Sequence, residues 1–158
     1  MKKLLLLSFV VFLLAVTSAH AQSSTTNSAD YKTALGIKFY PTGITIKHFI
    51  TDRHALEGLA YIFNYGSRIT GLYEIYGTIN NAGGLKWYVG PGAHIGFYNN
   101  KYGGATSIGI DGVLGLDYKI NPAPIDISLD WQPSVEFGNN FNNGFSGNWG
   151  GIGVRYTF

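Results

Sequence analysis

The amino-acid sequence predicts an all-β protein of eight antiparallel strands. Apolar and polar residues alternate along eight segments of the chain. Gly and Tyr, which favour tight turns and strands, account for 22 and 11 of the 158 residues. The stretches between the segments are short and rich in Gly, Asn, Pro, Ser and Asp. Because period-two alternation is typical of strands and the connections are too short for helices, these observations together favour an all-β fold.

The first 21 residues have the pattern of a secretory signal peptide. Lys2 and Lys3 precede an apolar run over residues 4–16, and Ala19-His20-Ala21 supplies the small residues of a cleavage site. The apolar run is shorter than the roughly 20 residues that a transmembrane helix needs. We therefore expect residues 1–21 to be removed on export.

Two further regions are expected after the signal peptide. Residues 22–30 are rich in Ser, Thr and Asn without periodicity, which predicts a flexible leader. Residues 31–158 form the single β-domain. The chain contains no Cys, which excludes a disulfide scaffold and a lipidated cysteine. Without Lys2 and Lys3, nine basic residues balance nine acidic ones, so the sequence predicts no nucleic-acid partner.

The eight expected strands differ in regularity. The clearest is Ile125–Phe137, in which thirteen residues alternate without a break. In Ile44–Ile50, His48 falls on the apolar face, and Ala55–Tyr65 alternates too poorly for its facing to be assigned. In chain order the expected strands are Thr33–Tyr40, Ile44–Ile50, Ala55–Tyr65, Arg68–Ile79, Trp87–Tyr98, Ile108–Ile120, Ile125–Phe137 and Gly151–Phe158.

The composition of the polar face predicts an up-and-down transmembrane β-barrel. This face consists largely of Gly, Ser, Thr, Tyr and Asn with few charges, whereas a face in water would carry many more Lys and Glu. Small polar residues fit a narrow lumen, and the apolar face then meets lipid. Aromatic residues near the expected strand ends match the girdles of membrane barrels. They are Tyr40, Tyr65, Trp87, Tyr98, Tyr118, Phe137, Trp149 and Phe158.

The chain resembles the small eight-stranded outer-membrane β-barrel proteins of Gram-negative bacteria, the group of outer-membrane proteins A, X and W. The resemblance rests on the cleavable signal, the alternating strands and the closing sequence Val154-Arg155-Tyr156-Thr157-Phe158. In this family, apolar residues at alternate positions before a final Phe act as a signal for the barrel-insertion machinery. The resemblance assigns that role to Val154, Tyr156 and Phe158. Residues 43–57 are similar to barrels of the Bacteroidota.

The lumen of such a barrel is expected to hold a network of paired charges. Eight strands enclose room only for side chains or one small ligand, and buried charges of both signs must pair. The expected network consists of Lys38, Lys47, Glu57, Glu74, Asp111, Asp117, Lys119, Asp126, Asp130, Glu136 and Arg155. A tight turn at residues 121–124 predicts that Lys119 faces Asp126. The last hairpin, extended inward from Phe137 and Asn148, predicts that Asp130 faces Arg155.

These features predict a non-enzymatic protein of the outer membrane, without cofactor or metal. His94 beside Asp111 or Ser107 is the candidate for catalysis, but the segment His94-Ile95-Gly96 lacks a hydroxyl two residues later. The expected role is structural or surface interaction in the envelope. The expected partners are outer-membrane lipid, lipopolysaccharide and the insertion machinery, with the surface ligand unnamed. Two alternatives stay open: a narrow porin-like channel for small solutes and a soluble, secreted, lipocalin-like ligand-binding barrel.

Overall fold

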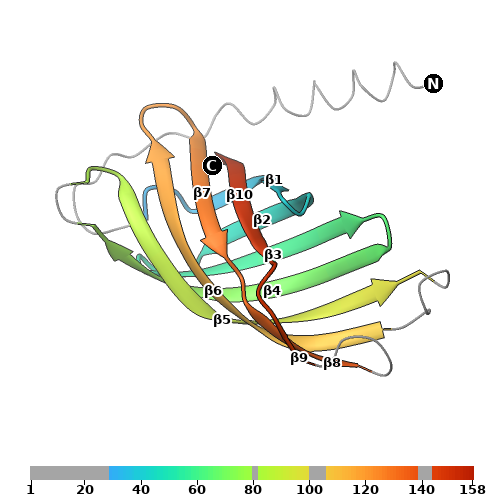
Figure 1. Ribbon diagram of the computed structural model, residues 1–158. Coiled ribbons are helices and arrows are strands. Elements are labelled where there is room, and N and C mark those ends of the chain that lie inside the picture. The colour runs from blue at the N-terminus through green and yellow to red at the C-terminus, as the bar shows by residue number, and fades with distance from the viewer. Residues whose placement is uncertain (1–28, 80–81, 100–105, 139–143) are drawn as a thin grey trace, which may run out of the picture.

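The computed structural model describes residues 29–158 except 80–81, 100–105 and 139–143, and its described part is all-β (Figure 1). The expected signal peptide and most of the expected leader lie outside the described residues. The strand segments are β1 (Thr33–Phe39), β2 (Gly43–Phe49), β3 (His54–Phe63), β4 (Gly66–Thr78), β5 (Leu85–Tyr98), β6 (Thr106–Ile120), β7 (Ile125–Trp131), β8 (Ser134–Gly138), β9 (Gly144–Ser146) and β10 (Gly150–Thr157).

These ten segments make up the eight strands of a closed antiparallel β-barrel with up-and-down order, as the sequence predicts, with β7 and β8 forming one strand and β9 and β10 another. Each strand pairs with its neighbour in sequence, and β1 pairs with β10 to close the sheet. Backbone hydrogen bonds between Thr33 and Phe158 extend this closure to the end of the chain. Closure through β1 and β10 gives both of these strands a partner on each side.

Two barrel strands are interrupted. β7 and β8 pair with β6 in one continuous register, and the break falls at Pro133, which has no N–H to donate. Between β9 and β10 the register changes by one residue, from Ser134 opposite Ser146 to Trp131 opposite Gly150. One extra residue in one strand is a β-bulge. The segment Gly144–Ser146 was expected within a loop, so this prediction was wrong.

The bulge depends on two glycines. Gly150 and Gly151 have φ of 138° and 147°, a region that side chains rarely adopt. A Cβ on Gly151 would lie 2.0 Å from the carbonyl oxygen of Phe39.

Replacing Gly151 by Ala is expected to lower the free energy of unfolding by about 1–3 kcal/mol, because the φ is unfavourable and the Cβ meets backbone. Denaturant unfolding of the purified barrel measures this. Gly71→Ala is the control, since Gly71 has open space around its Cβ position. Equal stability of the two variants would contradict the role of the bulge.

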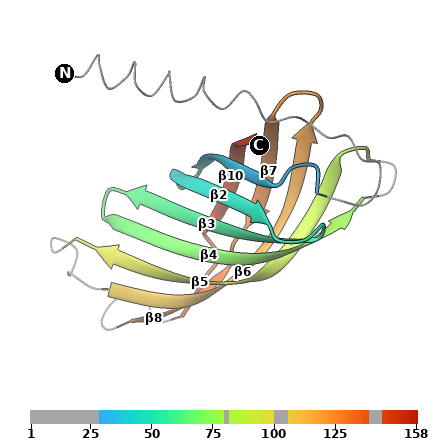
Figure 2. The ribbon, with the colours of Figure 1, turned by 180° about the vertical axis from the view of Figure 1, so that it is seen from behind.

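The barrel has two different ends. The termini end holds the start of β1, the end of β10 and the connections 50–53, 79–84 and 121–124. The loop end holds the connections 40–42, 64–65, 99–105 and 139–143. Figure 2, which shows the barrel from behind, places the C-terminus beside the β6–β7 turn at the termini end.

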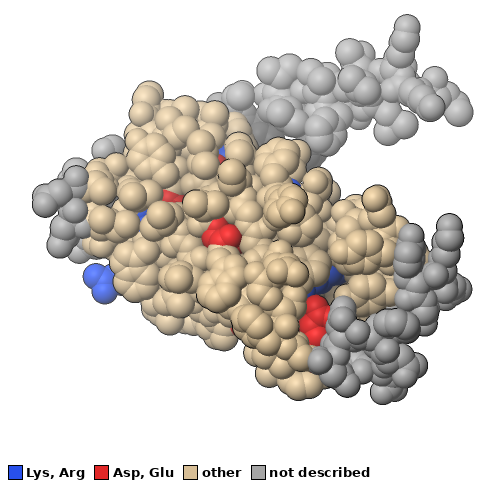
Figure 3. All heavy atoms as spheres, viewed as in Figure 1, with Lys and Arg blue, Asp and Glu red and all other residues tan. Residues whose placement is uncertain are grey.

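Polar side chains fill the barrel, and apolar side chains cover its outside. Along β2 and β7, buried and exposed residues alternate without exception. His48 lies outward with Ile44 and Ile46. In β3, for which the sequence did not predict the inward face, Glu57, Leu59 and Tyr61 point into the barrel. The space-filling view shows a surface with few charged atoms (Figure 3).

Candidate functional site

The candidate site is the polar lumen. All eleven charged residues expected there are buried, none more than 7% exposed. The structure adds inward-facing residues that the sequence analysis left out of the network. They are Arg68, His94, Gln132, Tyr61, Tyr76 and Tyr88. The contacts divide the lumen into a termini-end cluster around Lys47 and Arg155, a middle group around Asp130, and a loop-end cluster around Arg68.

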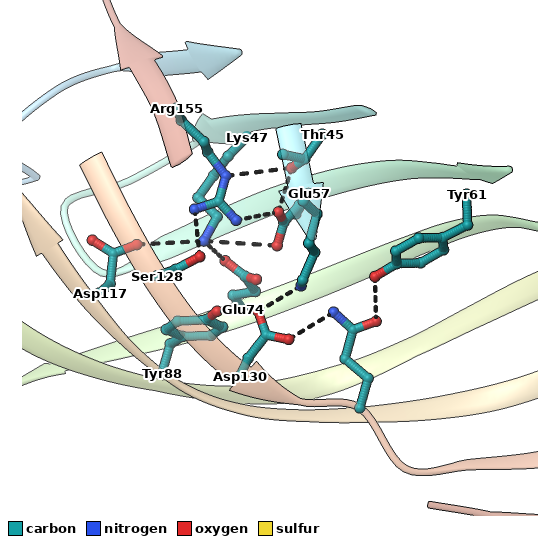
Figure 4. Close-up of polar contacts among 12 residues, drawn as sticks. Thr45, Lys47, Glu57, Tyr61, Glu74, Tyr88, Asp117, Ser128, Asp130 and Arg155 are labelled. Atoms are coloured by element: carbon teal, nitrogen blue, oxygen red, sulfur yellow. Dashed lines mark hydrogen bonds and ion pairs between the residues drawn. The ribbon is translucent and has the colours of Figure 1, made fainter. Parts of the chain in front are cut away.

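Lys47, on β2, lies at the centre of the termini-end cluster (Figure 4). Its Nζ lies 2.9 Å from Glu74 Oε2, 3.7 Å from Glu57 Oε2 and 3.5 Å from Asp117 Oδ2. It donates a hydrogen bond of 2.6 Å to the hydroxyl of Tyr76 and lies 4.4 Å from the centre of the Tyr88 ring. Carboxylates from three different strands and two aromatic rings thus surround one ammonium group.

Arg155, on β10, is the second cation of the same cluster, and its strand is separated from that of Lys47 only by β1. Its guanidinium pairs with Glu57, and Nη1 lies 3.0 Å from Asp126 Oδ2. It also donates to the hydroxyls of Ser128 at 2.8 Å and Thr45 at 3.3 Å. Because a guanidinium presents five N–H groups in a plane, one Arg joins four strands here. Glu57 contacts both cations and connects the two halves of the cluster.

The expected register of Lys119 opposite Asp126 is confirmed, but the two side chains form no ion pair, and the expected register of Asp130 opposite Arg155 was wrong because Asp130 lies opposite Gly151. The Nζ of Lys119 donates to the carbonyls of Ile120 and Ala123 in the turn. Asp126 pairs instead with Arg155, which lies directly opposite it. The expected register of the last hairpin failed because β9 and the bulge occupy residues that were assigned to a loop.

Lys119→Met is expected to change the free energy of unfolding by no more than about 1 kcal/mol, because it removes only hydrogen bonds to turn carbonyls. Lys38→Met is the contrasting variant, since Lys38 is fully buried and pairs with Asp130. Chemical unfolding of both variants measures the difference. A larger loss for Lys119→Met than for Lys38→Met would contradict the assigned contacts.

The middle group connects the two clusters. Asp130 accepts hydrogen bonds from Lys38 at 2.5 Å, from Tyr88 at 2.7 Å and from Gln132 at 3.1 Å. Gln132 in turn accepts one from Tyr61 at 3.1 Å. These residues come from β1, β3, β5 and the β7–β8 strand, so the chain of contacts crosses the lumen. The lumen is thus filled by its own side chains at this level.

Arg68 organises the loop-end cluster. It pairs with Asp111 and lies 3.4 Å from Glu136 Oε1. Its guanidinium carbon lies 4.0 Å from the centre of the Trp149 ring, a cation–π contact. Trp149 also packs against Tyr61 and was expected among the girdle aromatics. The bulge instead brings Trp149 into the lumen mouth.

His94 forms the expected contact with Asp111 but no catalytic triad. Nδ1 lies 2.8 Å from Asp111 Oδ2, and Nε2 lies 3.8 Å from Glu136 Oε1. Within the described residues, neither Nε2 nor the Ser107 hydroxyl has a hydrogen-bond partner. Ser107 Oγ and His94 Nε2 therefore do not form the hydrogen bond that joins nucleophile and base in a Ser–His pair. In the same part of the chain, no three His, Cys, Asp or Glu side chains are placed to hold a metal ion.

The closing strand places the residues of the expected assembly signal on the outer face. Val154, Tyr156 and Phe158 are 40%, 39% and 45% exposed, and their strand lies between β1 and β7. Other expected girdle residues are also half-exposed near strand ends, including Tyr65, Trp87 and Phe137. Residues 100–105 and 139–143, in two connections at the loop end, lie outside the described residues.

Comparison of the chain with protein-family models, with curated proteins and with solved structures finds no match. Over the ranges that the structure describes, no helix is long and apolar enough to cross a membrane.

Proposed function

We propose that this protein is an integral outer-membrane β-barrel of the kind found in Gram-negative bacteria, with a lumen closed by its own side chains. Its role is structural, or one of surface interaction in the envelope, and involves no catalysis. The observation that carries the proposal is the distribution of charge: every Asp, Glu, Lys and Arg within the described strands faces inward. The outer face of those strands carries Leu, Ile, Val, Phe, Tyr and Trp.

The cost of exposing apolar surface to water favours a lipid environment for this outer face. Most soluble proteins expose no contiguous apolar patch beyond a few hundred Å². Here exposed apolar side chains occur on all eight barrel strands, for example Ile37, Ile69, Ile110 and Leu129 at 49–60% exposure. In water this surface would drive aggregation, whereas in hydrocarbon it matches the solvent. A soluble lipocalin-like barrel would need the reverse arrangement to hold an apolar ligand.

The filled lumen favours a structural role over conduction. Ion pairs cross the barrel at three levels, through Lys47, Lys38 and Arg68. A conducting path would have to break these pairs, which costs several kcal/mol for a buried charge. The proposed partners are accordingly lipid, lipopolysaccharide and the insertion machinery, which would read the closing strand.

Expression of the full precursor in a Gram-negative host tests the proposal. The protein is expected in the outer-membrane fraction, with different gel mobility before and after boiling because a closed barrel resists detergent until heated. A soluble periplasmic species without this heat shift would overturn the proposal. Single-channel conductance in a planar bilayer would instead support the narrow channel.

A further inference from the structure

The segment before β1 crosses the mouth of the barrel at the termini end. Residues 29–32, here called the strap, continue directly into β1. The carbonyl of Lys32 accepts a hydrogen bond of 2.8 Å from Phe49 N, which fixes the strap beside β2. At its other end, Asp30 Oδ2 lies 2.9 Å from Lys86 Nζ on β5. The strap is thus held at both ends.

The two ends of the strap lie on opposite walls, at β1, into which the strap continues, and at β5, which carries Lys86. From β1 to β5 the sheet order passes three strands on one side, β2, β3 and β4. On the other side it passes the β9–β10 strand, the β7–β8 strand and β6, which are again three. In an eight-stranded barrel these positions are diametrically opposed. In both ribbon views the dark-blue segment before β1 runs toward the β4–β5 connection (Figures 1 and 2).

Tyr31 points from the strap into the barrel. Its ring lies edge-on to Phe49, with centroids 5.2 Å apart, and Phe49 in turn packs against Tyr76 at 4.8 Å. Ala29 and Tyr31 both pack against the buried cluster of the lumen. The Tyr31 hydroxyl is buried. Tyr76 and Tyr88 of this layer contact Lys47 directly, so Tyr31 is the outermost member of the layer over the termini-end cluster.

We propose that the strap is the closing element of this mouth and that Tyr31 shields the Lys47–Arg155 cluster from water and ions. The cluster holds four carboxylates, Glu57, Glu74, Asp117 and Asp126, against two cationic side chains. Displacement of the strap therefore opens the mouth to small cations in preference to anions. This inference does not rest on the membrane location, because it concerns the mouth of the barrel in any solvent.

A single introduced cysteine reports the state of the mouth. The chain contains no Cys, and Ser128 is 1% exposed with its hydroxyl on Arg155, so Ser128→Cys places one thiol of similar size inside the cluster. The purified barrel in detergent is treated with a small cationic or a small anionic thiosulfonate reagent. With the strap intact, both reagents are expected to react slowly.

Tyr31→Ala in the Ser128→Cys background is expected to accelerate labelling by the cationic reagent by roughly tenfold or more, because it removes the ring that fills the mouth. The anionic reagent is expected to gain less. Tyr31→Phe, which keeps the ring, and Tyr40→Ala, at the loop end, are the matched controls and should label as slowly as the parent. Equal rates with and without the Tyr31 ring would overturn the proposal.

Cross-linking tests the path of the strap in case Tyr31→Ala does not fold. A short bis-maleimide is expected to join Asp30→Cys to Lys86→Cys in high yield. It should not join Asp30→Cys to Arg53→Cys, which lies in the β2–β3 turn. Similar yields for the two pairs would show a strap that does not cross to β5, and would overturn the proposal. The heat shift on gels, measured on the same samples, reports separately on barrel formation.

Discussion

Arg155→Met is expected to lower the free energy of unfolding by about 3–5 kcal/mol, the largest loss among the variants considered for this protein. The substitution leaves the carboxylates of Glu57 and Asp126 buried without their guanidinium partner. The loss of stability arises mainly from these unpaired buried carboxylates, since the methionine side chain fills much of the volume of the arginine. Unfolding by urea of the barrel in detergent or lipid vesicles measures the loss.

Two further variants separate charge from packing. Adding Glu57→Gln to Arg155→Met is expected to recover part of the loss, because one of the unpaired carboxylates is then neutral. Arg53→Met, at an exposed turn residue, should stay within about 0.5 kcal/mol of the parent. An Arg155→Met barrel as stable as Arg53→Met would contradict a lumen held by paired charges.

Leu114→Arg is expected to lower the free energy of unfolding in lipid vesicles by about 2–4 kcal/mol, as for an arginine placed on the lipid face near the bilayer midplane. Leu114 faces outward on β6, is 53% exposed and lies near the middle of that strand. Unfolding from vesicles, with Leu114→Met as the apolar control, measures the change.

The comparison of Leu114→Arg with Leu114→Met distinguishes a membrane barrel from a soluble one, because the effect of the arginine on stability depends on the solvent around the barrel. In water, an arginine at a half-exposed surface position costs little and improves solubility. A Leu114→Arg protein as stable as Leu114→Met would place the outer face in water and contradict the proposed membrane location. The outcome is independent of the lumen contacts that Arg155→Met examines.

The sequence was sufficient to predict which residues of a strand face the lumen. It was insufficient to predict which of these residues contact each other. Period-two alternation assigned Asp126, Asp130 and Glu136 to one face of Ile125–Phe137, and all three are buried in the lumen. Arg68 was left out of the network although it begins the expected strand Arg68–Ile79 and shares the parity of Thr70 and Glu74 in β4. That parity was the signal that could have found it.

Pairing across the lumen has no local signal. Lys38 reaches Asp130 from a strand 92 residues away, and Tyr61 reaches Gln132 over 71 residues. Such contacts depend on barrel closure and on how far each strand is shifted along its neighbour. The β7–β10 register differs by four residues from the expected one, which places Asp126 rather than Asp130 opposite Arg155. Contacts across the lumen can therefore be assigned only from the three-dimensional structure, in which the register of each pair of strands is known.

The long-range ion pairs of the lumen also constrain how the barrel assembles. Arg155 meets Glu57 across 98 residues of chain, so this pair can form only when the last strand has joined the first. Until then, some of the oppositely charged partners would be missing for Lys38, Lys47, Glu57 and Glu74. Contacts this distant in sequence make folding slow, because the chain must close a long loop before they contribute. Entry of single hairpins into an apolar phase is accordingly disfavoured, and closure and desolvation become one cooperative event.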